Sequence, residues 1–371
     1  MDVLILSNCP AVEFQGSGYV IINNAKSLTN LGYKVKIVPP SEFSFLTFIS
    51  PRALFYRVLI GMSIWVIKNK RKIKDYKFII VYGSESALAI YILRKVLHIN
   101  IPIILHSNGI EDHVNYQLNR VKKYLNLKNK WYHSDRSFIN KYCYNNVDGI
   151  ITVSKYDSDF VIDFLKIAPA KVFFNEPCLP SIFFKTVVNE NIVKHNIITF
   201  CGTWIDRKGV NIITVVIPKI LRKYPNYIFR IIGVGNDFKL DDHFPSDIIQ
   251  QIELYPLVKS KLQIIALYNQ TSIFLFPSFC ESFGLVVAEA MFCKCAVITG
   301  PTGYGAALVN NEEAIILQVP NVTNVYSAVE KLINDEGFRH RLANKGRKKT
   351  EQLNWDLYDI KLRAILGEII F

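Results

Sequence analysis

The sequence has no apolar run long enough to cross a membrane as a helix. Its most apolar stretch, residues 58–67, is far shorter than the ~20 residues that a spanning helix needs. The first residues, MDVLILSN, lack a basic region before a short apolar run, so we expect a first strand there rather than a signal peptide. We also find no internal repeat and no low-complexity tract.

Signals for metals and nucleic acids are missing as well. The seven cysteines are scattered and odd in number, and the one close pair, Cys293 and Cys295, lacks the second pair that a zinc site would need. Because there is no paired-aspartate motif either, we expect no metal and no other cofactor. Unpaired cysteines favour a reducing, cytoplasmic compartment. No recognition motif for nucleic acid is present, so we expect no nucleic-acid partner.

The 371 residues are enough for two domains, and half of them are hydrophobic. The net charge of +13 is unevenly spread. Residues 1–180 contain 23 Lys and Arg against 13 Asp and Glu, whereas residues 181–371 contain 21 against 18. A basic first half indicates an anionic partner. An anionic membrane surface or an anionic lipid-linked acceptor is the preferred interpretation.

The most informative stretch is FPSFCESFGLVVAEAM, residues 276–291. The apolar run that ends at Phe276 is typical of a buried strand, and a helix is expected from Leu285 after a Pro-Ser break and a turn. The amides and dipole at the start of such a helix favour an anion. Glu281 and Glu289 bracket this point with seven residues between them. Sugar and ribose hydroxyls are suitable partners for such carboxylates.

The string P-S-x-x-E-S-F-G-x-x-x-x-E-A-M, followed by a strand at Ala296–Thr299, resembles the retaining glycosyltransferases of family 4. This resemblance implies an α/β protein of the GT-B fold, with two Rossmann-like domains facing each other across a cleft. It implies that Glu281 contacts the transferred sugar and Glu289 the ribose of a nucleotide diphosphate sugar. The donor phosphates would lie at the turn and helix start formed by Ser282, Phe283, Gly284 and Leu285.

A second phosphate cradle is outlined by GTWIDRKGV, which follows a strand at Ile197–Cys201. The resemblance implies that Lys208 binds the donor diphosphate. Thr203 stands where the family has an arginine, so Arg207 is expected to replace it; the alternative for both basic residues is a solvated helix start. Three glycines at strand ends allow a ligand close to the backbone: Gly202, Gly233 and Gly235.

The first half begins with a βαβ unit of the Rossmann type, formed by a strand at Val3–Ser7, a helix at Tyr19–Asn30 and a strand at Val35–Val38. Gly16 and Gly18 are expected in the loop before the helix. In the resembled family, glycines of this loop face the donor phosphates. The alternative is an ordinary loop.

A later strand ends at His106 and leads into SNGIEDH, at the sheet edge where open α/β sheets bind ligands. The family often shows H-G-x-E here, so Asn108 occupies the histidine position. An amide can hydrogen-bond a sugar hydroxyl but cannot act as an acid or base. His106 is a candidate to compensate, and its alternative is a histidine of the core or loop.

Residues 51–77 combine an apolar helix with the basic run KNKRKIK. This composition suits a membrane interface. It equally suits a core helix whose solvated basic end complements the helix dipole. Both interpretations stay open.

We expect an N-terminal acceptor domain over residues 1–185, a nucleotide-sugar domain over 186–353 and a last helix over 354–371 that crosses back to the first domain. The expected function is retaining transfer of a hexose from a nucleotide diphosphate sugar to a glycan or lipid-linked acceptor in surface polysaccharide or lipopolysaccharide biosynthesis. One rival is a sugar-nucleotide epimerase or hydrolase. Another is a non-catalytic binding protein, which is favoured by the departures from the family at Asn108, Thr203 and Ala307.

Overall fold

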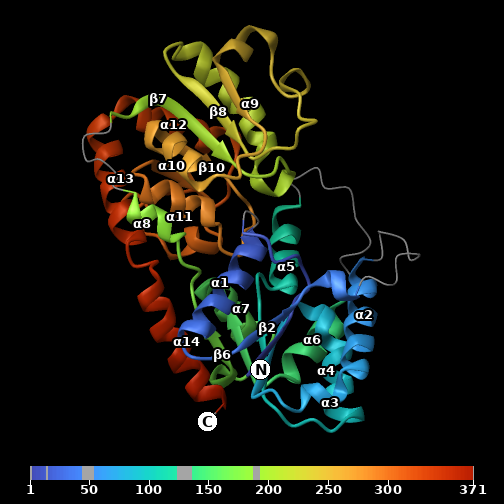
Figure 1. The fold of residues 1–371 in the computed structure, drawn as a ribbon. Coiled ribbons are helices and arrows are strands. Elements are labelled where there is room, and N and C mark those ends of the chain that lie inside the picture. The colour runs from blue at the N-terminus through green and yellow to red at the C-terminus, as the bar shows by residue number, and fades with distance from the viewer. Residues whose placement is uncertain (1, 14–15, 44–53, 123–135, 187–192, 371) are drawn as a thin grey trace. The chain divides into compact units, whose positions relative to one another are not determined.

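A computed structural model describes residues 2–13, 16–43, 54–122, 136–186 and 193–370. The chain forms two compact units, each built on a parallel six-stranded sheet covered by helices (Figure 1). Unit 1 comprises residues 1–113, 130–177 and 355–371, and unit 2 comprises residues 114–129 and 178–354. The prediction of an α/β protein with two Rossmann-like domains is confirmed.

The sheet of unit 1 has the order β2-β1-β3-β4-β5-β6. Its strands are β1 (Val3–Leu6), β2 (Val35–Val38), β3 (Phe78–Tyr82), β4 (Ile103–His106), β5 (Gly149–Thr152) and β6 (Val172–Phe174). The four central strands are buried along their whole length, which explains their continuous apolar runs. The strand order reverses between β1 and β3, and ligands of such sheets bind beyond the carboxyl ends at this switch point.

Helices cover both faces of this sheet. They are α1 (Gly16–Asn30), α2 (Leu54–Lys68), α3 (Lys70–Ile73), α4 (Ala87–Tyr91) with a π-helical continuation (Ile92–Val96), α6 (Ser137–Asn145), α7 (Lys155–Asp163) and α14 (Trp355–Ile370). Helix α5 (Glu111–Val121) starts in unit 1 and ends in the segment grouped with unit 2. Helix α2 packs on α4, which packs on α6, while α1 packs with α14 (Figure 1).

The prediction that Gly16 and Gly18 belong to a loop is wrong. Both lie in the first turn of α1. A Cβ on Gly18 would lie 2.5 Å from the backbone N and O of Val12, so this glycine lets the preceding loop pack against the helix. A Cβ on Gly16 would meet nothing within 4 Å.

The C-terminal helix α14 belongs to unit 1. Asp359 accepts hydrogen bonds from Ser27 and Asn30 of α1, and the side chain of Ile369 lies against Gly149. The division before Cys178 puts α8 (Ser181–Lys185) in unit 2, whereas the expected boundary lies after residue 185.

The sheet of unit 2 has the order β12-β11-β10-β7-β8-β9. Its strands are β7 (His195–Cys201), β8 (Ile228–Ile232), β9 (Ile252–Tyr255), β10 (Thr271–Phe276), β11 (Ala296–Thr299) and β12 (Ile315–Ile316). Its helices besides α8 are α9 (Val210–Lys223), α10 (Lys261–Gln270), α11 (Leu285–Phe292), α12 (Val322–Asn334) and α13 (Glu336–Thr350). Here the strand order reverses between β7 and β10, so the loops after these two strands mark the expected ligand edge.

Helix α2 answers in part what its sequence left open, although residues 51–53 lie outside the described residues. One side packs into unit 1 through residues such as Phe55, Met62 and Val66. The outer side keeps Tyr56 and Ile60 exposed, together with Ile67. The helix is therefore part of the core and also carries an apolar stripe on the surface.

Candidate functional site

Basic side chains gather at the switch point of unit 2. Arg207 and Lys208 end the short 3-10 helix that follows β7. Nη1 of Arg207 donates to the carbonyl of Cys280 at 2.8 Å and lies 3.6 Å from Oε1 of Glu281. Nζ of Lys208 lies 3.9 Å from the same oxygen of Glu281. Two cations converge on one carboxylate, and their excess positive charge favours an anion beside them.

Glycine makes the position of Lys208 possible. A Cβ on Gly202 would lie 2.6 Å from Nζ of Lys208, so any larger residue would displace the ammonium group. Gly202 also has a φ of +139°, a backbone conformation that residues other than glycine rarely adopt. Gly233 borders Gly202, where its built Cβ would be 3.5 Å from the Gly202 nitrogen, and the space beside Gly235 is open to 4 Å.

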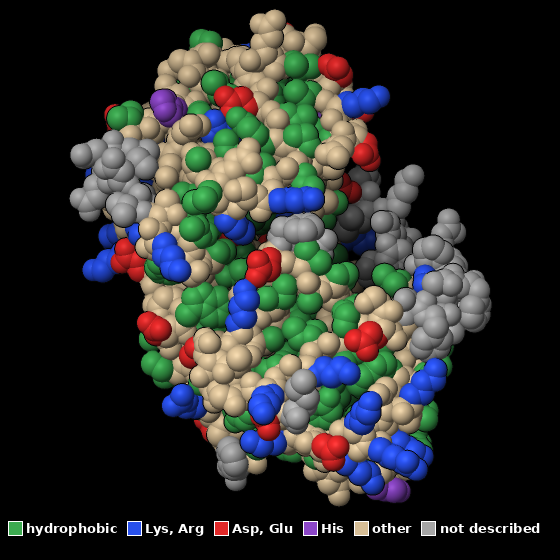
Figure 2. Space-filling view, in the orientation of Figure 1, with side chains coloured by type: hydrophobic (Ala, Val, Ile, Leu, Met, Phe, Trp, Pro, Cys, Tyr) green, Lys and Arg blue, Asp and Glu red, His purple; other side chains and the backbone are tan. Residues whose placement is uncertain are grey.

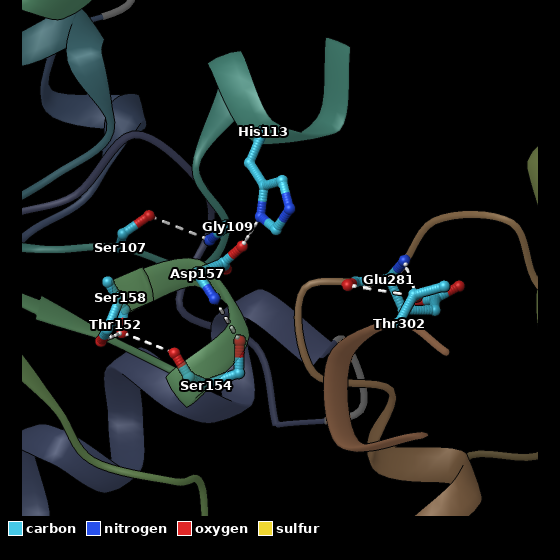
Figure 3. A network of polar contacts seen from close by, with 9 residues as sticks. All are labelled: Ser107, Gly109, His113, Thr152, Ser154, Asp157, Ser158, Glu281 and Thr302. Atoms are coloured by element: carbon cyan, nitrogen blue, oxygen red, sulfur yellow. Dashed lines mark hydrogen bonds and ion pairs between the residues drawn. The ribbon is translucent and has the colours of Figure 1, made fainter. Parts of the chain in front are cut away.

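Glu281 is held by its own backbone and by neighbouring hydroxyls. Its amide donates to Oγ1 of Thr302 at 2.6 Å, as Figure 3 shows. The hydroxyl of Ser278 lies 3.2 Å from Oε1 of Glu281 and 3.1 Å from the carbonyl of Arg207. The Glu281 side chain is only 13% exposed. These contacts fix the carboxylate beside the two cations.

The helix α11 begins beside this group of residues. Gly284 precedes it in the left-handed conformation (φ 84°, ψ 55°), and no side chain caps the helix. Ser282, Gly284 and Leu285 are half-buried, whereas Phe283 is buried against Tyr304. The first amides of α11 lack partners within the helix and lie at the positive end of its dipole. This end can therefore accept a phosphate.

Glu289 lies one turn further along α11. It is 2% exposed, and its Oε1 forms an ion pair with Nζ of Lys261, the first residue of α10. Within the described part of the chain, Oε2 of Glu289 accepts no hydrogen bond. One carboxylate oxygen is therefore engaged and the other is available.

The predicted residues after β4 in unit 1 lie in different surroundings. His106 is completely buried and stacks on Tyr82, with ring centroids 5.0 Å apart. Among the described residues, neither of its ring nitrogens has a hydrogen-bond partner. Burial lowers its pKa to about 3, so the imidazole is neutral at physiological pH. The side-chain amide atoms of Asn108 are also buried and lack hydrogen-bond partners in the part of the chain that the structure describes. The amide of Asn108 can serve a ligand hydroxyl, whereas His106 belongs to the core.

Unit 1 carries carboxylates at its own switch point. The side-chain amide of Asn8, after β1, donates to Oε2 of Glu85, after β3, at 3.1 Å. The hydroxyl of Ser84 donates to Oε2 of Glu111 at 3.3 Å. Burial, and next the charge of Glu111, raises the pKa of Glu85 to about 7. This edge offers hydrogen-bond acceptors to a ligand.

A buried pair joins the first turn of α5 to α7. Nδ1 of His113 lies 2.6 Å from Oδ1 of Asp157, and both side chains are 3% exposed (Figure 3). The ring of His113 stacks on Phe160, with centroids 4.3 Å apart. Burial raises the pKa of Asp157, while the hydrogen bond from His113 opposes this effect. The pair fixes the helix that follows Asn108.

Two global features bear on cofactors and membranes. Among the residues that the structure describes, no group of three or more His, Cys, Asp or Glu side chains is placed to hold a metal ion. In the same part of the chain, no helix combines the length and the apolar character needed to span a bilayer.

Comparison with known families explains this arrangement. Residues 183–349 match the family described as Glycosyl transferases group 1, and residues 14–174 match Glycosyltransferase Family 4. The two matches fall on the two Rossmann-like halves of the fold. Each half of the chain therefore resembles a glycosyltransferase family, and the fold is of the GT-B type.

The chain is 27% identical over 231 residues to an uncharacterized glycosyltransferase of Methanocaldococcus jannaschii, with 62% of each chain covered. It is 28% identical over 188 residues to the capsular polysaccharide biosynthesis glycosyltransferase CapM of Staphylococcus aureus, which covers 49% of this chain and 48% of CapM. The matched segments therefore span less than two thirds of either relative.

Solved structures share the fold of the chain over its whole length. Sucrose-phosphate synthase from Thermosynechococcus elongatus superposes with a TM-score of 0.76 at 14% identity, covering 99% of each chain. The Anabaena protein HepE, solved in complex with UDP, superposes with a TM-score of 0.65 at 12% identity, covering 99% of this chain and 100% of HepE.

Sequence reasoning missed several residues of the candidate site. Thr302 lies in the loop GPTGYG, and nothing in that loop indicates that its hydroxyl meets Glu281. Lys261 belongs to no recognised motif. A lone lysine at a helix start usually faces solvent, so its contact with Glu289 was not expected. The Pro-Ser pair did mark the break after β10, but the contacts of the Ser278 hydroxyl could not be read from it.

Proposed function

We propose that the chain transfers a hexose from a nucleoside diphosphate sugar to a glycan or lipid-linked acceptor and retains the anomeric configuration. The observation that carries this proposal is the convergence of Arg207 and Lys208 on Glu281 beside the free start of α11. A diphosphate is the common anion that fits two adjacent cations and a helix N-terminus together. That the structural neighbour HepE was solved with UDP supports this class of donor.

In this proposal, Lys208 and Arg207 bind the diphosphate and stabilise the negative charge that develops as it leaves. Glu281 accepts hydrogen bonds from hydroxyls of the transferred sugar, and Glu289 accepts them from the ribose. Asn108 donates to a sugar hydroxyl. The acceptor gives its proton to a donor phosphate oxygen, so no side chain acts as the base. No metal is required, because the cations and helix end neutralise the phosphates.

We propose a surface polysaccharide, lipopolysaccharide or other lipid-linked glycan as the acceptor, on the cytoplasmic face of a membrane. The relative CapM, a capsular polysaccharide biosynthesis glycosyltransferase, supports the acceptor class. All seven cysteines are free, and six of them are buried, which is consistent with a reducing compartment.

A basic surface of unit 1 supports contact with an anionic membrane. Tyr56, Ile60 and Ile67 are 44%, 36% and 46% exposed on the outer side of α2. The basic residues directly after this stripe are all exposed: Lys68, Lys70, Arg71, Lys72 and Lys74. Figure 2 shows Lys and Arg side chains gathered at the lower right, below α2. Each cation near an anionic surface contributes about 1 kcal/mol of binding.

The first test is calorimetric titration with UDP-, GDP- and ADP-sugars. We expect one donor to bind and Lys208→Met to weaken that binding by about 10- to 100-fold, as is typical for loss of a charged hydrogen bond. Lys219→Ala, which removes an exposed lysine from α9, should leave binding unchanged. If no donor binds, even with membrane extract added, the transferase proposal fails.

The product distinguishes the rivals. Incubation of the bound donor with membrane extract should yield a glycosylated acceptor whose new linkage has the anomeric configuration of the donor, read by NMR. Nucleotide release without acceptor would indicate a hydrolase, an altered donor sugar an epimerase, and binding without turnover a non-catalytic protein.

The membrane contact is tested with sedimenting vesicles. The chain should bind phosphatidylglycerol vesicles but not phosphatidylcholine vesicles, and high salt should release it. The triple variant Lys70→Gln, Arg71→Gln, Lys72→Gln should lose this binding. A control with equal charge loss on exposed positions of α13 should retain it: Arg341→Gln, Lys345→Gln, Lys348→Gln. Equal binding to both vesicle types would refute the contact.

A further inference from the structure

The ion pair between Lys261 and Glu289 joins the first residue of α10 to α11. Lys261 is that first residue of α10, where Ser260 caps the amide of Gln263. The helix dipole disfavours a cation at a helix N-terminus, so the position of Lys261 on α10 does not itself favour a lysine. Its ammonium instead reaches α11 and contacts Oε1 of Glu289. Burial lowers the pKa of Lys261, but the Glu289 carboxylate outweighs this effect and raises it overall.

The pair presents two kinds of hydrogen-bonding group side by side. Oε2 of Glu289 has no hydrogen-bond partner within the described residues, and a carboxylate oxygen that is paired with an ammonium group acts as an acceptor. The Lys261 ammonium has three N–H groups, of which Glu289 takes one, and it can only donate. The Lys261 side chain is 33% exposed.

A vicinal diol matches these two groups. Each hydroxyl can donate one hydrogen and accept another, so one hydroxyl can donate to Glu289 while its neighbour accepts from Lys261. We propose that Lys261 is a specificity-determining residue that, together with Glu289, recognises the 2′,3′-diol of the donor ribose. This inference rests on the proposed function, in which Glu289 contacts the ribose. It adds a second partner and predicts discrimination against nucleotides that lack one hydroxyl.

The competing interpretation is that Lys261 merely occupies the site. In that case a nucleotide must displace the ammonium from Glu289, and removal of Lys261 would strengthen binding. The two interpretations predict changes of opposite sign, so one titration separates them.

The experiment compares ribose and deoxyribose nucleotides. The wild-type chain is titrated with UDP, GDP and ADP, and then with the 2′-deoxy form of the one that binds best. We expect the ribonucleotide to bind at least tenfold more tightly than the deoxynucleotide. Lys261→Met should weaken ribonucleotide binding about 10- to 100-fold and bring the two affinities close together. Lys261→Arg keeps the charge and the donors and should preserve most of the discrimination, whereas Lys219→Ala should behave as wild type.

A folding control uses the partner carboxylate. Without Lys261, Glu289 is a buried carboxylate without a cation, which destabilises a fold. If Lys261→Met fails to fold, the double variant with Glu289→Gln removes that charge. The double variant should then bind the ribonucleotide more weakly than Glu289→Gln alone, because it also lacks the Lys261 donor, and equal affinity of these two variants would refute the inference.

The outcomes separate the two levels of the argument. If wild type binds none of the three nucleotides, the proposed function and this inference fall together. If it binds, but Lys261→Met keeps the same ratio of ribose to deoxyribose affinity, only this inference is refuted. Tighter binding by Lys261→Met would also refute it and establish the ammonium as a competitor.

Discussion

Replacing Gly202 with alanine tests the geometry around Lys208 most directly. The added Cβ would lie 2.6 Å from Nζ of Lys208, which is too close for any contact. Because that nitrogen is the far end of a flexible side chain, the ammonium can move while the surrounding strands stay in place. Gly202→Ala should therefore remove Lys208 from its position beside Glu281 without changing either of those residues.

The size of the effect has two parts. A residue other than glycine at a φ of +139° costs on the order of 1–3 kcal/mol of folding stability. Loss of the charged hydrogen bond between Lys208 and a diphosphate costs about 1.5–3 kcal/mol of binding, which corresponds to roughly 10- to 150-fold in affinity. The first cost appears in an unfolding experiment and the second in a titration, so the two are measured separately.

The assay is calorimetric titration of UDP, GDP and ADP, combined with urea unfolding. Gly337→Ala serves as the control in unit 2, because its Cβ would stand at 3.4 Å and 3.6 Å from the ends of two side chains, which is ordinary contact. Lys208→Met should weaken binding about as much as Gly202→Ala. The double variant should be no weaker than Lys208→Met alone, since both changes remove the same contact.

Wild-type affinity in a folded Gly202→Ala variant would refute this reasoning, because Lys208 would then not need its observed position. Additive losses in the double variant would show that Gly202 acts on the ligand through its own backbone.

Two further predictions concern unit 1. The raised pKa of Glu85 means that the folded state holds a proton more tightly than the unfolded state, so this group's contribution to stability falls as pH rises from about 4.5 to about 7. Glu85→Gln should be near wild type in stability at pH 4.5 and more stable than wild type at pH 8 by about 2–3 kcal/mol in urea unfolding. An equal effect on stability at both pH values would contradict the raised pKa of Glu85. Asp157→Ala removes the buried hydrogen bond to His113 and should cost about 1.5–3 kcal/mol of unfolding free energy at pH 7. Asp163→Ala, which changes an exposed residue at the end of the same helix, is the control. Equal stability of the two variants would show that the His113–Asp157 pair contributes nothing to stability.

Much of the fold could be predicted because parallel strands buried on both faces leave apolar runs in the sequence. The bounds expected for Val35–Val38 and Ala296–Thr299 agree with β2 and β11. The turn before α11 was recognisable because a glycine directly precedes an apolar helix. Gly18 was wrongly predicted to lie in a loop because its sequence context is ambiguous. Glycine suits both a loop and a tightly packed helix start, and only the contact with Val12 separates the two.

The candidate site was less predictable, because its contacts join residues far apart in the sequence. The motif brought Glu281 and Glu289 to attention, and the cradle brought Lys208. The ion pair of Glu289 with Lys261 depends on how α10 and α11 pack, which no local pattern reports. His106 shows the limit of reasoning from strand ends. Its place in the chain suits a ligand edge, but its ring turns into the core against Tyr82.

The net charge of the first half indicated the charge of its outer surface but not the charge at its switch point. The expected anionic partner follows from the excess of basic residues before residue 180, yet the switch point of unit 1 carries Glu85 and Glu111. The basic excess lies partly on the exposed run from Lys68 to Lys74. In unit 2, where charge is nearly balanced, Arg207 and Lys208 concentrate positive charge at one point. A nucleoside diphosphate should therefore bind to unit 2, and an anionic surface should bind to unit 1, because the local placement of basic side chains decides where each anion binds.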